Sequence, residues 1–237
     1  MLFRLIVPML AALMLGSPVT APPAARPGLW RISAGGAQLY LFGTVHRLPP
    51  RLPWLNGWVA TALDESDMVL LESAGPLPPP RPSAWRRAAA REGAALDAAG
   101  LSPVFGGEAV LARVAARRGM AVHGFETTRA AIDRLDAIDP AAQAAIAARA
   151  PSPLAARAVI GRWAAGDAGA AARQARRELS PALAARLIDA PDTLYARAIA
   201  DRLARRAPRS FVAIGAGHVP GVLARLRAHG LTVRRLQ

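Results

Sequence analysis

Four polar side chains each stand at the end of a short apolar run: His46, Glu72, Glu126 and His218. Such runs are typical of buried strands, and ligands of open α/β sheets bind beyond the carboxyl ends of the strands. Residues far apart in sequence can therefore converge there. Two imidazoles with one or two carboxylates suit zinc, manganese or cobalt, and such an ion makes bound water nucleophilic near neutral pH. The pattern predicts a metal site that activates water.

The two histidines share a local pattern, because His46 and His218 each stand third after a glycine. Glycine allows the chain to turn sharply after a strand or to approach a ligand closely. Pro220 also places His218 near the start of a helix, whose dipole favours the neutral imidazole that a metal ligand needs. The alternative for each histidine is a hydrogen-bonded structural residue.

The two glutamates differ in strength as candidates. Glu72 closes a continuous apolar run, so we expect it to be buried and paired or to belong to a site. Glu126 is equally well explained as a cap for the helix that follows it. The other two histidines are expected to be structural, because His123 lies inside a strand and His229 lies in a last helical turn before Gly230.

These candidates must be positioned by strands that alternate with helices. Apolar runs bounded by turn residues predict strands over residues 29–33, 38–42, 68–71, 121–125, 210–214 and 231–235. Helical spacing predicts helices over 54–65, 105–118 and 220–229, and several short helices between 127 and 206. The expected fold class is α/β, with a central mixed or mostly parallel sheet flanked by helices and a large all-helical insertion or cap at about 128–206.

Composition narrows the function classes. The 237 residues are 53% hydrophobic, which suits one globular domain, and the absence of cysteine excludes disulfides and thiolate metal sites. The formal net charge is +14, but the arginines are scattered at helical spacing and aromatic residues make up only 5%. We therefore expect no specific nucleic-acid site, while a weak association with a membrane surface stays open.

The first residues have the pattern of a targeting segment. Arg4, a short apolar run and small residues ending at Ala21 predict a secretory signal peptide over 1–21, and hence an exported, periplasmic protein. The alternative is an uncleaved segment that anchors the chain to the inner membrane. A proline-rich linker over 22–28 then leads into a single domain at 29–237.

Several stretches together resemble the TraB/GumN family, which is similar to the TIKI metalloproteases. Residues 29–32 with 39–46 resemble the family's opening motif, and residues 211–221 resemble its closing motif. The looser similarities lie at residues 67–72, 119–127, 163–167 and 230–236. The chain departs from the family where Gly107-Glu108 replaces a frequent aspartate, and where Arg197 is followed by alanine instead of asparagine.

The resemblance implies a metal-dependent, peptidase-like hydrolase of the cell envelope, acting on a peptide or a small molecule. His46, Glu72 and His218 would hold manganese, cobalt or zinc, and Glu126 would be a further ligand or the general base. Arg197 would bind a substrate carboxylate or a developing oxyanion. The alternative is a non-catalytic periplasmic protein that binds or sequesters a peptide, haem or another small molecule on the same face.

Overall fold

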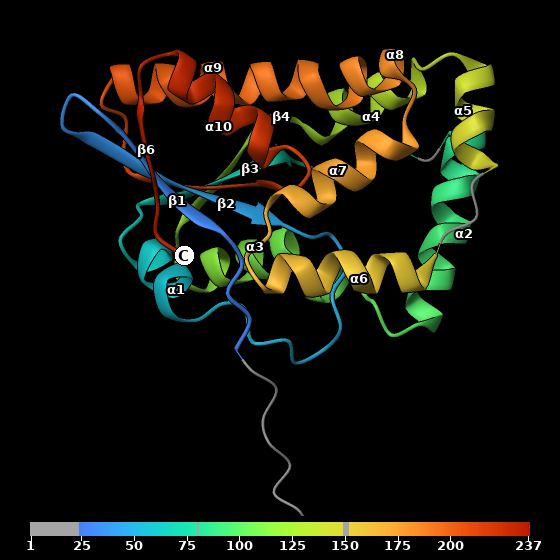
Figure 1. The fold of residues 1–237 in the computed structure, drawn as a ribbon, viewed down its shortest axis with the longest axis horizontal. Helices are drawn as coiled ribbons and strands as arrows, with labels where there is room; N and C mark the ends of the chain where they lie inside the picture. Colours follow the sequence, from blue (N-terminus) through green and yellow to red (C-terminus); the bar gives the residue numbers. More distant parts are fainter. Residues whose placement is uncertain (1–23, 80, 149–151) are drawn as a thin grey trace, which may run out of the picture.

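The computed structural model describes residues 24–79, 81–148 and 152–237. The predicted signal peptide therefore lies outside the described residues. The described chain forms three layers, in which one sheet lies between two layers of helices (Figure 1). None of the helices in these ranges is both long and apolar enough to cross a membrane.

The sheet has six strands in the order β4-β3-β5-β2-β1-β6. Their bounds are β1 Leu29–Ala34, β2 Ala37–Thr44, β3 Met68–Ala74, β4 Ala121–Thr127, β5 Ser210–Gly215 and β6 Thr232–Arg235. The four strands from β4 to β2 run parallel, whereas β1 pairs antiparallel with both β2 and β6. The predicted α/β fold with a mixed sheet is confirmed.

The helices cover both faces of this sheet. They are α1 Gly57–Asp64, α2 Ala84–Ala98, α3 Gly107–Arg117, α4 Thr128–Asp136, α5 Pro140–Ala147, α6 Pro153–Ala164, α7 Gly169–Glu178, α8 Pro181–Ala184, α9 Ala190–Ala204 and α10 Val219–Ala228. The helix predicted from residue 54 begins only at Gly57, because Trp54 is buried in the core from the preceding loop. The helix predicted over 105–118 is divided at Gly106 into a 3₁₀ turn and α3.

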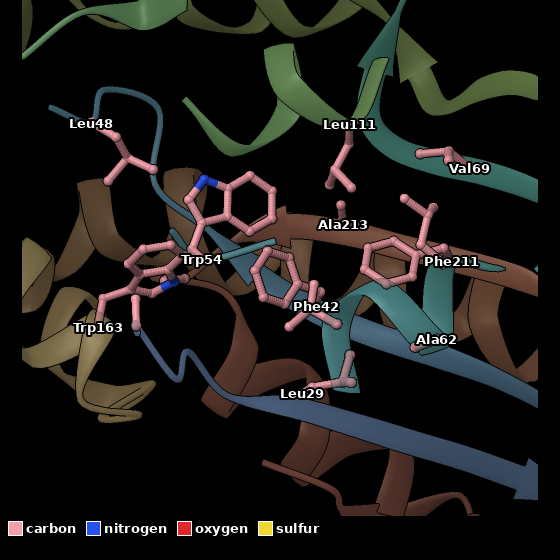
Figure 2. Packing of buried hydrophobic residues seen from close by; sticks show 14 of the residues in the cluster. Leu29, Phe42, Leu48, Trp54, Ala62, Val69, Leu111, Trp163, Phe211 and Ala213 are labelled. Carbon is pink, nitrogen blue, oxygen red and sulfur yellow. The ribbon is translucent and has the colours of Figure 1, made fainter. Parts of the chain in front are cut away.

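Alternate strand residues face the two helical layers. In β3, Val69 packs on the side of α1, α3 and α6, whereas Leu70 packs on the side of α9 and α10. The first side holds an aromatic cluster in which Phe42 stacks on Trp54 with ring centroids 5.4 Å apart, and Trp163 meets Phe42 edge-on at 6.2 Å (Figure 2). This two-sided burial is what keeps the carboxyl ends of the strands in a fixed arrangement.

Among the described residues between β4 and β5 the regular elements are all helices, and parts of this block belong to the core. Trp163 of α6 lies in one hydrophobic cluster, and Ile199 of α9 lies in the other. The predicted linker is also packed over its described part, since Ala25 is buried and the Arg26 N–H donates to the Ala164 carbonyl. Part of the expected insertion therefore helps to position the site.

Candidate functional site

The carboxyl ends of three adjacent strands bring three of the predicted residues together. His46 follows β2, Glu72 lies near the end of β3, and His218 occupies the N-cap position of α10 after β5. Gly215 ends β5 between them. A side-chain carbon at Gly215 would lie 3.1 Å from Glu72 Oε1, 3.7 Å from His218 Cδ2 and 3.8 Å from His46 Nε2. The three side chains thus surround a place that only glycine leaves open.

Glu72 is held toward this place by the backbone. Its Oε1 accepts a hydrogen bond of 2.5 Å from the Gly215 N–H and lies 3.8 Å from His218 Nε2. The Glu72 side chain is about one-fifth exposed, so its carboxylate is neither solvated on a surface nor enclosed in the core. The sequence predicts a Glu72 that is either buried and paired or part of a site; in the structure it is partly buried and hydrogen-bonded to the backbone.

Each histidine has a carboxylate on the far side of its ring. His46 Nδ1 lies 3.0 Å from Glu108 Oε2, and the other Glu108 oxygen accepts from Thr44 Oγ1 at 2.6 Å. His218 Nδ1 lies 2.7 Å from Asp192 Oδ1. An ionised carboxylate can only accept, so each Nδ1 carries the proton and each Nε2 is left for another partner. Histidines that bind metal ions commonly have this arrangement.

Two glycines allow Glu108 to reach His46. A side-chain carbon at Gly106 would lie 2.1 Å from the His46 carbonyl oxygen, and one at Gly107 would lie 2.8 Å from Thr44 Cβ. The start of α3 therefore rests directly on the loop after β2. Glu108 in the first turn of α3 is thereby placed beside the imidazole.

Asp192 is fully buried near the start of α9. Its second oxygen, Oδ2, has no hydrogen bond and lies 3.6 Å from Arg225 NH1 of α10. The helices can approach this closely because position 221 is glycine, where a side-chain carbon would lie 1.8 Å from Asp192 Oδ2. A buried carboxylate is costly unless it is paired, so His218 and Arg225 together explain its presence.

The carboxylates control the protonation of both imidazoles. The hydrogen bond to Glu108 raises the pKa of His46 to about 9. Burial lowers the pKa of His218, but the hydrogen bond to Asp192 and the charge of Glu72 outweigh it and raise the pKa overall. The two carboxylates thus oppose the effect that the sequence predicts from the helix N-terminus, because they favour the charged imidazolium over the neutral ring. A metal ion that binds at Nε2 would have to displace the proton that the imidazolium carries on that atom.

The side chains of His46, Glu72 and His218 are of the types that bind a metal ion, but they lie farther apart than the ligands of one ion. Within the described ranges, no group of three or more histidine, aspartate or glutamate side chains is placed closely enough to hold an ion. The Nε2 atoms of both histidines and a carboxylate oxygen of Glu72 nevertheless face one place, and the His46 side chain is 72% exposed beside it. The set thus fits zinc, manganese or cobalt in chemistry, and its role stays a prediction.

The two residues predicted to act in catalysis lie differently. Both oxygens of Glu126 accept from the Arg134 guanidinium, at 2.6 and 2.7 Å, while Thr127 caps α4 in its place. Arg197 is exposed on α9, two positions after buried Tyr195, and therefore on the opposite side of the helix. The structure does not bring Arg197 to the three converging residues.

A residue that the sequence did not single out completes the surroundings. The Tyr195 ring is only 1% exposed and meets the His218 ring edge-on, with centroids 5.5 Å apart. Burial and then the charges of Glu72 and Glu126 raise the pKa of Tyr195, so its hydroxyl is protonated at neutral pH. His123 and His229 are exposed, on β4 and at the end of α10, away from this cluster.

Comparison with known proteins gives one match. No curated protein and no solved structure is similar to this chain at a significant level. The model of the TraB/PrgY/gumN family matches residues 28–89 and 79–235. These ranges include both Gly-x-x-His segments, Glu72 and the whole helical block between β4 and β5. The chain therefore belongs to the TraB/PrgY/gumN family.

Proposed function

We propose that this protein is a metal-dependent hydrolase of the cell envelope that acts on a peptide or a small molecule. The observation that carries the proposal is the pair of imidazoles whose Nδ1 atoms are held by carboxylates. Their Nε2 atoms are thereby directed, with Glu72, to the place left open by Gly215. Buried polar arrangements of this kind are costly to build and are typical of functional sites.

The roles follow from this geometry. His46 and His218 would hold the ion through Nε2, and Glu72 would hold it through Oε1. When bound, such an ion would supply a nucleophilic water at neutral pH and would polarise the substrate carbonyl. Glu108 and Asp192 fix the two rings and keep the Nδ1 proton in place.

Glu126 remains the candidate for the general base, but in the structure its carboxylate is occupied by Arg134. The two groups form a bidentate pair, so Glu126 can take a proton only after the guanidinium has moved. A substrate carboxylate is a suitable replacement, because guanidinium binds any carboxylate in the same bidentate way. For Arg197, its exposed place on α9 gives no support to a role in binding substrate.

Removal and return of metal test the proposed activity. Protein treated with a chelator should lose hydrolysis of fluorescently labelled casein peptides and recover it with manganese, cobalt or zinc. Glu72→Gln should remain inactive with every ion, whereas Glu92→Gln, an exposed glutamate of α2, should behave as the wild type. Turnover that survives complete metal removal would overturn the proposal.

A non-catalytic binding protein is the second candidate, favoured by the absence of a ready three-donor site among the described side chains. It predicts stoichiometric ligand capture with no turnover under any metal. Both candidates place the protein in the periplasm. N-terminal sequencing of periplasmic protein tests that location, because cleavage after Ala21 gives a chain beginning at Pro22.

A further inference from the structure

The Tyr195 hydroxyl is a polar group whose position no structural role explains. Its ring is buried between Phe125, with centroids 4.9 Å apart, and His218, at 5.5 Å. In the described part of the chain the hydroxyl makes no hydrogen bond to protein. Packing alone would be served equally well by phenylalanine, which avoids a buried hydroxyl without a partner.

This hydroxyl is not sealed in the core. The described polar side-chain atoms that are fully enclosed and have no partner are Arg134 Nε, Asp192 Oδ2 and Arg202 Nε, and the Tyr195 oxygen is not one of them. A residue that is 1% exposed therefore has some of that exposure at its hydroxyl. The oxygen therefore keeps a small contact with the space beside it.

The side chains around the phenol indicate where its hydroxyl lies. The carboxylate with the strongest effect on the phenol is Glu72, followed by Glu126, and the ring lies against His218. Tyr195 therefore faces the converging residues from the α9 side of the sheet. The carboxylates there only accept hydrogen bonds, and the nearby Arg134 guanidinium is occupied by Glu126.

We propose that the Tyr195 hydroxyl donates a hydrogen bond to the carbonyl oxygen of the substrate, which makes it a catalytic residue of the proposed hydrolase. When the oxygen of water adds to the carbonyl carbon, the π electrons of the C=O bond move to the carbonyl oxygen, and the proton lost by the water passes to Glu126, the proposed general base. The tyrosine keeps its own proton and stabilises that oxyanion. A donor fixed in a buried place is effective here, because it needs no reorganisation as the charge develops.

Tyr195→Phe tests this inference with a matched control, since the only other tyrosine is Tyr40. Tyr40 donates to Glu65, far from the cluster, so Tyr40→Phe should leave turnover unchanged. Tyr195→Phe should lower kcat about 100-fold while KM and metal content stay near the wild-type values. Melting temperatures of both variants confirm that they fold. Full kcat in Tyr195→Phe would overturn the inference.

A second readout does not depend on turnover. An alanyl-alanine analogue with a phosphinate in place of the scissile carbonyl has a tetrahedral oxyanion, and calorimetry measures its binding to protein with and without metal. We expect at least tenfold weaker binding to Tyr195→Phe than to wild type and Tyr40→Phe. Equal affinity, or no binding to wild type in either state, would overturn the inference. If the protein holds no metal and has no activity but Tyr195→Phe still binds the phosphinate more weakly, the proposed hydrolase and the catalytic role are rejected, and Tyr195 is only a donor to a bound oxyanion.

Discussion

At the scale of single residues, the carboxylate behind each imidazole is the most informative feature. A free histidine on a surface can turn and titrate independently, whereas His218 is fixed by a fully buried aspartate at 2.7 Å. That contact selects the tautomer and aims Nε2 at Glu72, 3.8 Å away. Burying the Asp192 carboxylate costs free energy, which a purely structural histidine would not require.

Asp192→Ala should therefore weaken metal binding more than it changes the fold. Loss of the partner that orients His218 is expected to lower the affinity for zinc about 10- to 100-fold. Asp192→Asn, whose amide oxygen can still accept from Nδ1, should lose less. Competition with a fluorescent chelator measures both affinities. Asp201→Asn, on the exposed side of the same helix, is the control, and an equal loss there would contradict the account.

Glu108→Gln should lower the pKa of His46 from about 9 toward its ordinary value of 6.5. The glutamate charge stabilises the imidazolium, so removing it favours the neutral ring. In metal-free protein, the stabilisation from this pair is complete below pH 6.5 and disappears as the pH rises through 9. NMR titration of the His46 ring protons measures the shift. An unchanged pKa would show that Glu108 does not control this histidine.

The sequence reveals the converging residues better than their partners. His46, Glu72 and His218 follow apolar strands, and that local pattern survives in the structure. Glu108 and Asp192 lie in helices, where a carboxylate resembles an ordinary solvated residue. Their roles depend on approaches between segments distant in sequence, so no local pattern marks them.

At the scale of elements, glycines determine how closely the segments around the site approach. The strands and the fold class follow from continuous apolar runs bounded by turn residues, as β3 and β5 show. The packing of α3 on the loop after β2, and of α9 on α10, follows from missing side chains at Gly107 and Gly221. Such contacts are not readable from spacing, because a glycine in a helix has several explanations.

Gly221→Ala should disrupt the contact between α9 and α10. The new methyl group would overlap Asp192 Oδ2 and force the helices apart, at a cost of about 1–3 kcal/mol in the free energy of unfolding. The affinity for zinc should fall with it, because the bond between Asp192 and His218 is lost. Urea unfolding and metal competition measure the two effects.

Gly217→Ala is the matched control for that change. It lies in the same segment, and a side-chain carbon there would have no atom within 4 Å. Its stability and metal affinity should stay close to those of the wild type. Equal behaviour of the two variants would show that close helix packing does not position His218.

At the scale of the whole molecule, the positive charge is spread over both helical layers. Many arginines are paired with carboxylates, as in Arg86 with Asp136 and Arg118 with Asp64. These arginines thus belong to solvated helix faces with local ion pairs, whereas Glu72, Glu108 and Asp192 gather around the two histidines at the carboxyl end of the sheet. Substrate selection is expected to depend on that end of the molecule.

Binding to nucleic acid should accordingly be weak and non-specific. Fluorescence anisotropy with a DNA duplex at low salt should show association that disappears at moderate salt, because only phosphate contacts contribute. Two unrelated sequences should bind equally. Tight binding that survives salt and distinguishes the two sequences would contradict the expectation.

The central claim is that His46, Glu72 and His218 act as one metal-binding unit. The ratio of bound metal to protein after cobalt loading and gel filtration tests it most directly. The account predicts one ion per chain in wild type and in His229→Ala, which changes an exposed histidine at the end of α10. It predicts almost none in His46→Ala or His218→Ala. A His218→Ala protein that keeps its full metal ratio would contradict the account.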